Sequence, residues 1–355
     1  MSESSVFGRL QEGCVIPAHP LALTPENKLD ERCQRALTRY YLAAGAGGLA
    51  VGVHTTQFAI HDEKVGLYKP VLELAMEAAR ERVESGGVGR PIMIAGLVGE
   101  TAQAVREAEL AAELGYHLGL LSLTALQGRS IDDLIDHTRR VADVMPVMGF
   151  YLQPALSRMV LPKEFWSRLL EIPNVRAIKI APFNRYQTLD VLEAVAHSGR
   201  EGEIALYTGN DDHIIVDLVT PYVFRTERGE VTLRLVGGLL GQWACWTRRA
   251  VEHLDTIREI RRTKGPVPQE MLALASQLTL ANKAIFDADN SFIGCIPGVS
   301  YVLKQQGLMS HIGALDPTER LSPGQVEQID TVMRRYPHLT DNDFVEANLA
   351  RWLSA

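Results

Sequence analysis

Residues 175–182 read Val175-Arg176-Ala177-Ile178-Lys179-Ile180-Ala181-Pro182, a largely apolar run with a lysine in its second half. β-Branched residues flank this lysine and a proline follows the run, which is typical of a short, buried strand of a parallel sheet. Burial of an ammonium group is costly, so we expect a lowered pKa for Lys179 and a fraction of free amine. A free amine at a strand end is suited to Schiff-base formation with a carbonyl compound, whereas an ion-paired or snorkelling lysine is the structural alternative.

Seven further apolar runs accompany this strand candidate, and amphipathic stretches separate them. The other strand candidates are residues 14–18, 48–53, 91–96, 117–123, 146–151, 203–208 and 232–237. The helix candidates are residues 30–44, 67–84, 100–114, 131–144, 163–170, 186–197 and 212–218. A strand and a helix that alternate every ~25–30 residues predict an α/β fold of the (β/α)8 TIM-barrel class, with right-handed crossovers.

The last part of the chain departs from this alternation. Residues 224–230 resemble an extra charged hairpin or loop inserted before the eighth strand. After a plausible linker at 263–268 the pattern becomes helical, with candidates at residues 269–284, 300–306, 323–335 and 342–353. We therefore predict a barrel over residues 1–265 and a C-terminal helical region over residues 266–355. A doubly wound sheet is the main alternative, but no GxGxxG motif follows the first strand.

Composition narrows the class of protein. A net charge of −7 over 355 residues gives no electrostatic footprint for nucleic acid or an anionic membrane. No apolar run approaches the ~18–20 residues of a membrane span, and the first residues lack the features of a signal peptide. The four cysteines lie far apart without a CxxC pair, which indicates reduced thiols rather than a metal site. These features predict a cytoplasmic enzyme or binding protein.

Polar and small residues follow several predicted strands, where a barrel enzyme has its active site. The candidates are His54, Thr55 and Thr56 after the second strand, Tyr151 at the end of the fifth, Gly209 and Asn210 after the seventh, and Trp243 beyond the eighth. Together with Lys179 they provide an amine, a phenol and hydroxyl groups, the parts that a Schiff-base aldolase needs. Asp211 and Asp212 are expected to cap the next helix.

At these positions the chain resembles the dihydrodipicolinate synthase / N-acetylneuraminate lyase superfamily of class I, pyruvate-type aldolases. Tyr151-Leu152-Gln153-Pro154 is similar to the family's YNxP motif, and Ala177-Ile178-Lys179-Ile180 is similar to its GIKE motif. The tyrosine and the lysine have the family's spacing of about 28 residues. Thr208-Gly209-Asn210-Asp211 resembles the family's SGDD motif, and the resemblance extends over roughly residues 13–310.

The resemblance implies a lyase that acts on pyruvate, a related 2-oxo acid or a 2-keto-3-deoxy sugar acid by aldol cleavage, condensation or dehydration. Lys179 would form the imine and Tyr151 would act as general acid and base, with no cofactor and no metal. Thr55, or Thr56 in another alignment, would bind the substrate carboxylate. Gly209, Asn210 and Trp243 would lie near the substrate. The family also implies a homo-oligomer, a dimer or a tetramer.

Three departures from the family pattern bear on the reaction. His54 replaces the first threonine of the family's proton relay, residues 122–126 lack the relay's second tyrosine, and Thr56-Gln57 replaces the family's Gly-Glu pair. These changes argue against dihydrodipicolinate synthase proper and favour a sugar-acid aldolase or dehydratase. His54 is an acid/base candidate, a substrate ligand or a structural histidine. The sequence also leaves open a barrel that only binds a small metabolite, and an unrelated barrel enzyme with a phosphate site at Gly237-Gly238.

Overall fold

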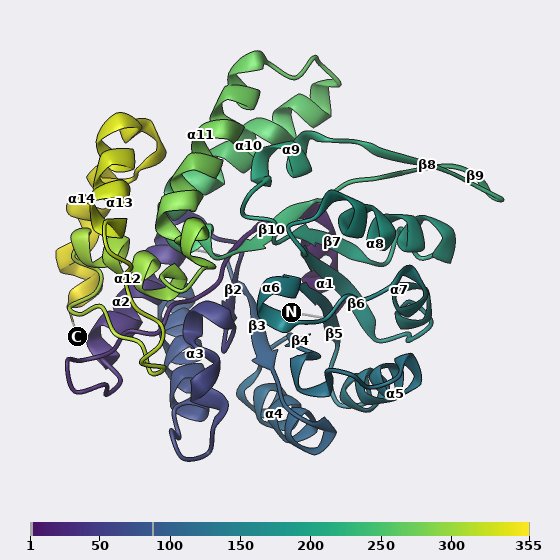
Figure 1. Cartoon of the computed structure of the whole chain (residues 1–355), viewed down its shortest axis with the longest axis horizontal. Helices are drawn as coiled ribbons and strands as arrows, with labels where there is room; N and C mark the ends of the chain where they lie inside the picture. Colours follow the sequence, from purple (N-terminus) through teal and green to yellow (C-terminus); the bar gives the residue numbers. More distant parts are fainter. Residues whose placement is uncertain (1–2, 87–88, 355) are drawn as a thin grey trace. The chain divides into compact units, whose positions relative to one another are not determined.

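The computed structural model describes residues 3–86 and 89–354 (Figure 1). Eight parallel strands follow one another in the sheet in the order β1-β10-β7-β6-β5-β4-β3-β2. The two ends of this order are joined, because Ala18 next to β1 and Ala50 in β2 form a parallel bridge. The chain therefore has the predicted (β/α)8 barrel fold, with helices between the strands and further helices at the C-terminal end.

The barrel strands are nearly all buried along their length, as their continuous apolar sequences predict. Seven of the eight predicted strands coincide largely with a barrel strand, and β6 has the predicted bounds 175–181. The strands are β1 (Val15–Pro17), β2 (Gly48–Val51), β3 (Ile92–Leu97), β4 (Leu118–Leu121), β5 (Val147–Leu152), β6 (Val175–Ala181), β7 (Ala205–Thr208) and β10 (Gly237–Leu240).

The prediction of the eighth strand at residues 232–237 was wrong. The eighth barrel strand is β10, which begins at Gly237, while β9 (Gly229–Leu233) pairs antiparallel with β8 (Tyr222–Thr226) in a two-stranded ribbon (Figure 1). Two consecutive glycines are poor strand formers, so propensity disfavoured β10. The packing requires Gly237, because a Cβ atom there would lie 2.4 Å from the carbonyl oxygen of Cys14. The extra hairpin that was expected near residues 224–230 is confirmed.

The helices agree with the predicted stretches, with a few additions. The sequence missed α1 (Glu3–Glu12) and the short α6 (Pro154–Ser157), and of α10 (Thr247–Thr263) it indicated only residues 252–264, as a solvated helix face. The helices of the alternating part are α2 (Glu31–Ala44), α3 (Tyr68–Glu84), α4 (Thr101–Leu114), α5 (Ile131–Ala142), α6 (Pro154–Ser157), α7 (Lys163–Leu169), α8 (Arg185–Ser198) and α9 (Ile214–Val219). Those of the C-terminal part are α11 (Gln269–Ile285), α12 (Cys295–Gln305), α13 (Gln325–Arg335) and α14 (Asn342–Leu353). The 3-10 turns are η1 (His54–Thr56), η2 (Phe58–His61), η3 (Thr124–Leu126), η4 (Gln242–Ala244), η5 (Ala288–Asn290) and η6 (Pro337–Leu339).

Contacts within the chain define two compact units. The first consists of residues up to Cys14 with Ile94–Leu239, and the second of Val15–Met93 with Leu240–Ala355. In the first unit the buried Tyr207 hydroxyl donates to the Leu10 carbonyl oxygen at 2.8 Å, so α1 is fixed to β7. None of the described helices has the length and the apolar character that crossing a membrane requires.

In the second unit a buried carboxylate fixes the last helices. Asp341, which is fully buried before α14, accepts hydrogen bonds from the Tyr40 hydroxyl at 2.7 Å and the Gln306 amide at 2.8 Å. It also accepts one from the Arg248 backbone N–H at 3.0 Å. Since buried polar groups need partners, this carboxylate ties α14 to α2, to α10 and to the end of α12.

Candidate active site

Lys179 lies in the middle of β6, with Phe150 of β5 and Tyr207 of β7 as its partners in the sheet. The residue is 7% exposed, and this burial lowers the pKa of Lys179 to about 8, although the nearby Asp211 carboxylate acts in the opposite direction. No salt bridge to Lys179 occurs among the described residues. With such a pKa, roughly a tenth of the lysine is free amine at neutral pH. The lowered pKa and the fraction of free amine that the sequence predicted for Lys179 therefore follow from its burial in β6.

Gly209 packs directly on the Lys179 side chain. A Cβ atom at position 209 would lie 2.7 Å from Lys179 Cε and 2.7 Å from Ala181 Cβ, so only glycine fits beside the extended lysine. Its N–H donates to the Ile180 carbonyl oxygen at 2.7 Å, which holds the end of β7 against β6. The structure thus brings together two of the predicted site residues.

Tyr151 and Lys179 are not brought together. Side chains alternate along a strand, and Phe150, not Tyr151, is the partner of Lys179. The Tyr151 ring packs against Trp166 of α7 with centroids 5.2 Å apart, and its hydroxyl accepts a hydrogen bond from the Leu161 N–H at 3.3 Å. The phenol therefore lies on the helix-facing side of β5, and its predicted role in proton transfer stays a proposal.

The loop after β7 is built around a buried carboxylate. Asp217 is fully buried and accepts hydrogen bonds from Thr208 at 2.7 Å, Asn210 at 3.0 Å, His213 at 3.1 Å and Tyr222 at 3.2 Å, and from Arg185. Burial raises its pKa, but these hydrogen bonds and the positive charge of Arg185 outweigh that effect and keep the pKa of Asp217 below its ordinary value. The loop that carries Gly209 is consequently held by an ionised group.

Two sequence assignments in this loop need revision. The amide of Asn210 is committed to the protein, because it donates to Asp217 and its oxygen accepts from the Phe183 N–H at 3.0 Å. Asn210 thus fixes the loop after β6. The prediction that Asp211 and Asp212 cap the next helix was wrong, since α9 begins after His213. Asp211 is instead 8% exposed, and its charge raises the pKa of Lys179, which the capping assignment did not predict.

The threonines after β2 lie in the second unit, in the turn η1. The Thr56 hydroxyl donates to the His19 carbonyl oxygen at 2.6 Å and accepts from the Gly52 and Val53 N–H groups at 3.0 and 3.1 Å, so it is fully occupied. The Thr55 hydroxyl donates to the Ala18 carbonyl oxygen at 2.7 Å and retains acceptor capacity. Of the two, only the Thr55 hydroxyl is held by a single hydrogen bond, and to donate to a carboxylate it would have to turn away from the Ala18 carbonyl oxygen.

His54 and Trp243 also belong to the second unit. The His54 ring is partly exposed and lies 5.7 Å from the Phe58 ring, centroid to centroid. Trp243 is 2% exposed, and its carbonyl oxygen accepts a hydrogen bond from the Thr247 hydroxyl at 2.6 Å. Trp243 is thus a core residue of this unit, whereas His54 has an accessible ring. Among the described residues, no group of three or more His, Cys, Asp or Glu side chains is arranged to hold a metal ion.

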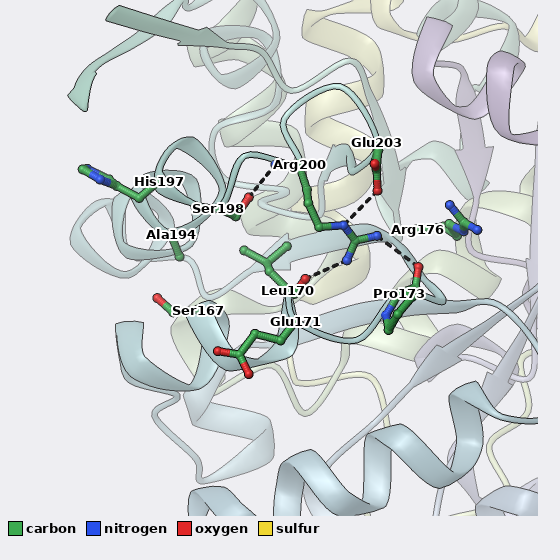
Figure 2. A pocket seen from close by; sticks show the side chains of 10 residues that line it. All are labelled: Ser167, Leu170, Glu171, Pro173, Arg176, Ala194, His197, Ser198, Arg200 and Glu203. Carbon is green, nitrogen blue, oxygen red and sulfur yellow. Dashed lines mark hydrogen bonds and ion pairs between the residues drawn. The ribbon is translucent and has the colours of Figure 1, made fainter. Parts of the chain in front are cut away.

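A pocket of about 590 Å³ lies elsewhere, at the amino ends of β6 and β7 (Figure 2). Its lining residues are Ser167, Leu170, Glu171, Pro173, Arg176, Ala194, His197, Ser198, Arg200 and Glu203. Arg200 donates to the Glu203 carboxylate and to the carbonyl oxygens of Leu170, Ile172, Pro173 and Val175 at 2.7–3.0 Å. All five of its donors are used, so the guanidinium group is a structural clamp at the end where barrels have no active site.

Comparison with known proteins gives the family. The model of the dihydrodipicolinate synthetase family matches residues 12–220. The chain belongs to this family. The resemblance inferred from the motifs is confirmed, and an unrelated barrel enzyme is excluded. The 4-hydroxy-tetrahydrodipicolinate synthase of Bifidobacterium longum (strain DJO10A) is 27% identical over 213 residues, which cover 59% of this chain and 62% of that protein. The match thus spans less than two thirds of that relative.

Solved structures of the dihydrodipicolinate synthetase family have the same fold. The chloride-inhibited dihydrodipicolinate synthase of Acinetobacter baumannii complexed with pyruvate has a TM-score of 0.71 at 17% identity, covering 91% of this chain and 98% of that one. The N-acetylneuraminate lyase of Fusobacterium nucleatum has a TM-score of 0.70 at 16% identity, covering 92% and 99%. At these identities the likeness concerns the fold alone, and this family member is a divergent one.

Proposed function

We propose that this protein is a class I lyase that forms a Schiff base between Lys179 and pyruvate, a related 2-oxo acid or a 2-keto-3-deoxy sugar acid. The observation that carries the proposal is the buried lysine in β6, with a pKa of about 8, packed against Gly209, which directly follows the adjacent strand β7. The family supports it, since a relative with this fold is named as a complex with pyruvate. The substrate would be a small molecule, and the covalent imine would replace a cofactor.

The chemistry follows from the amine. Free Lys179 Nζ attacks the keto carbon of the 2-oxo acid, and the resulting carbinolamine loses water to give an imine. The protonated imine withdraws electrons from the adjacent carbon. The bond between that adjacent carbon and the next, hydroxyl-bearing carbon can then break: a base takes the hydroxyl proton, an aldehyde leaves, and the electron pair of the bond remains as an enamine. The same bond forms in the reverse direction. In a dehydration a base removes a proton from the adjacent carbon, and the next carbon loses its hydroxyl group, which leaves as water after protonation. Each route needs a group that moves protons.

Tyr151 is the proposed acid and base on the strength of its motif. Its hydroxyl now accepts from the Leu161 N–H, and Phe150 occupies the position next to Lys179. The role therefore requires the end of β5 to rearrange when substrate binds. His54, whose ring is accessible, is the second candidate for proton transfer. Thr55 is the proposed ligand of the substrate carboxylate, while Asn210 and Trp243 would contribute to the site through the loops they stabilise.

One alternative has a specific observation in its favour. A barrel that binds a 2-oxo acid without turning it over would have lost its acid and base, and a phenyl ring beside Lys179 in place of a hydroxyl group fits that description. Dihydrodipicolinate synthase proper is disfavoured because the threonine and the second tyrosine of the relay are absent. A sugar-acid aldolase or dehydratase is favoured. We also propose a cytoplasmic homo-oligomer, a dimer or a tetramer, by analogy with the family.

Trapping with borohydride tests the proposal. Incubation with pyruvate and a set of 2-keto-3-deoxy acids, followed by reduction, is expected to fix one substrate molecule on Lys179, and the Lys179→Ala variant is the control. Formation of an aldehyde or loss of water from one of these acids by the unmodified protein would then distinguish a lyase from a binding protein.

A further inference from the structure

The loop between α12 and α13 is attached to the turn that carries Thr55. Gln57, which is 2% exposed and follows η1 directly, donates from Nε2 to the Gly313 carbonyl oxygen at 3.1 Å. Its Oε1 accepts a hydrogen bond from the Leu315 N–H at 2.6 Å. Both polar ends of one buried amide are therefore used by a segment more than 250 residues away in the chain.

The side-chain chemistry at position 57 matters. An ionised glutamate at this position would lack the donor that the Gly313 carbonyl oxygen requires. An amide supplies one donor and one acceptor, which is what the two backbone groups of residues 313 and 315 need. The glutamine is thus matched to this loop.

The backbone conformation of Gln57 indicates that its two side-chain hydrogen bonds also stabilise the turn η1. Its φ of 69° and ψ of 113° are disfavoured for a residue with a side chain, and its N–H closes η1 on the His54 carbonyl oxygen at 2.9 Å. Such a conformation persists only where surrounding contacts impose it. The two hydrogen bonds of the Gln57 side chain are such contacts.

A second part of the C-terminal region reaches the same turn. A Cβ atom at Gly241, just after β10, would lie 3.3 Å from Cζ of Phe286 and 3.7 Å from Cγ2 of Thr55. The Phe286 ring, at the end of α11, and the Thr55 methyl group therefore both lie beside Gly241, where a Cβ atom would be tight against the ring and in ordinary contact with the methyl group. The Thr55 carbonyl oxygen in turn accepts a hydrogen bond from the Leu21 N–H at 3.3 Å.

We propose that Gln57 is a positioning residue that joins the loop at Gly313–Leu315 to the Thr55 turn and thereby holds this turn in the shape that binds the carboxylate of a 2-oxo acid. The inference rests on the proposed function, in which Thr55 receives that carboxylate. It gives the C-terminal helical region a part in substrate recognition, although Gln57 itself does not touch the substrate.

The test compares pyruvate with its uncharged amide, pyruvamide. In borohydride trapping, Gln57→Met, which keeps the volume but loses both hydrogen bonds, is expected to raise the half-saturating pyruvate concentration about tenfold. The value for pyruvamide and the maximal extent of trapping are expected to stay within about twofold of the unmodified protein, because pyruvamide has no carboxylate to misplace. Gln328→Met, at an exposed glutamine of α13, is the matched control. Unchanged half-saturation for pyruvate, or equal losses for both ketones, would overturn the proposal.

Gln57→Glu tests whether restoring the two hydrogen bonds restores pyruvate binding. Protonation of the glutamate at low pH would restore them, whereas a general loss of structure would not be reversed by lowering the pH. When protonated, the carboxyl group donates and accepts like the amide, and burial favours that form. The defect for pyruvate is expected at pH 8 and should shrink to within about twofold of the unmodified protein when both are measured at pH 5.5. A defect in Gln57→Glu without one in Gln57→Met would mean that charge alone is responsible, which contradicts positioning.

Two safeguards keep the result interpretable. If the Gln57 variants do not fold, Leu315→Pro removes the N–H that Gln57 accepts and leaves the turn untouched, and the same selective loss for pyruvate is expected. Calorimetric binding of pyruvate and pyruvamide is measured in parallel. If the unmodified protein gives no covalent adduct, the Schiff-base function fails, while the ratio of the two binding constants in Gln57→Met still decides the role of Gln57.

Discussion

Nζ of Lys179 lies 4.5 Å from the centroid of the Phe150 ring, its partner across β5 and β6. A ring face attracts an ammonium group, by about 0.5–2 kcal/mol, whereas burial disfavours the same charge. Burial is the largest influence and lowers the pKa of Lys179 to about 8, while the Asp211 carboxylate acts in the opposite direction. The ring face of Phe150 is a further group that favours the ammonium form, so the amount of free amine depends on burial and on both neighbours.

This balance predicts the pH dependence of imine formation. The amine reacts only when neutral, so the initial rate of trapping should rise with pH through a midpoint of about 8 and level off above it. Phe150→Leu keeps an apolar neighbour but removes the ring face, which stabilises only the ammonium form. Its midpoint should therefore move below that of the unmodified protein. A midpoint near 10, the ordinary range for lysine, would contradict the burial argument.

Tyr151→Phe separates a catalytic phenol from a structural one. If the phenol moves protons, imine formation should slow by about 10²–10⁴-fold, and pyruvate binding should persist. This result is expected from the proposed function, and stopped-flow or quenched trapping measures it. A variant with an unchanged rate and a free energy of unfolding lower by about 1 kcal/mol would show that the hydroxyl only supports the Leu161 N–H.

Gly209→Ala tests the packing beside the lysine. The new methyl group would overlap Lys179 Cε, at 2.7 Å, and should displace the side chain from its present position. We expect the second-order rate of trapping to fall at least about tenfold, because a misplacement of about 1 Å is sufficient for such losses. Gly202→Ala, where a Cβ atom would have no neighbour within 4 Å, should leave the rate unchanged. Equal behaviour of both variants would argue against the contact.

Asp217→Asn tests the buried carboxylate under the loop after β7. Removing its charge weakens the hydrogen bonds that this buried group accepts and its ion pair with the partly exposed Arg185, so the free energy of unfolding should fall by about 1–3 kcal/mol. The difference in unfolding free energy between the two proteins should become smaller at low pH. Asp217 has a lowered pKa in the folded protein, so its ionised form stabilises the fold at higher pH, and this contribution is lost when the pH falls far enough to protonate it. Asp132→Asn, in an exposed ion pair with Arg168, should change stability by less than about 1 kcal/mol. Chemical unfolding followed by circular dichroism would measure both.

Much of the fold follows from the sequence, because apolar runs and helical periodicity mark the strands and helices locally. The seven-residue strand β6 and the environment of Lys179 were predictable for this reason. The eighth strand was missed because Gly237 and Gly238 are selected by close packing, as the contact of position 237 with Cys14 shows, and not by strand propensity.

The side that Tyr151 faces was not predictable from its motif. The spacing to Lys179 is that of the relatives, but a shift of register between Val147 and Met148 offsets β5 against β6. A shift of one residue exchanges the two faces of a strand, so Phe150 stands where the tyrosine was expected. Gln57 was noticed only as a departure from the family, since its partners at residues 313 and 315 are distant in the chain.

The most direct measurement is mass spectrometry of peptides after reduction of the protein with borohydride in the presence of pyruvate. The proposed function predicts one reduced pyruvate adduct on the peptide that contains Lys179, and none in the Lys179→Ala variant. An adduct on another lysine, or no adduct with pyruvate or with any 2-keto-3-deoxy acid, would contradict it.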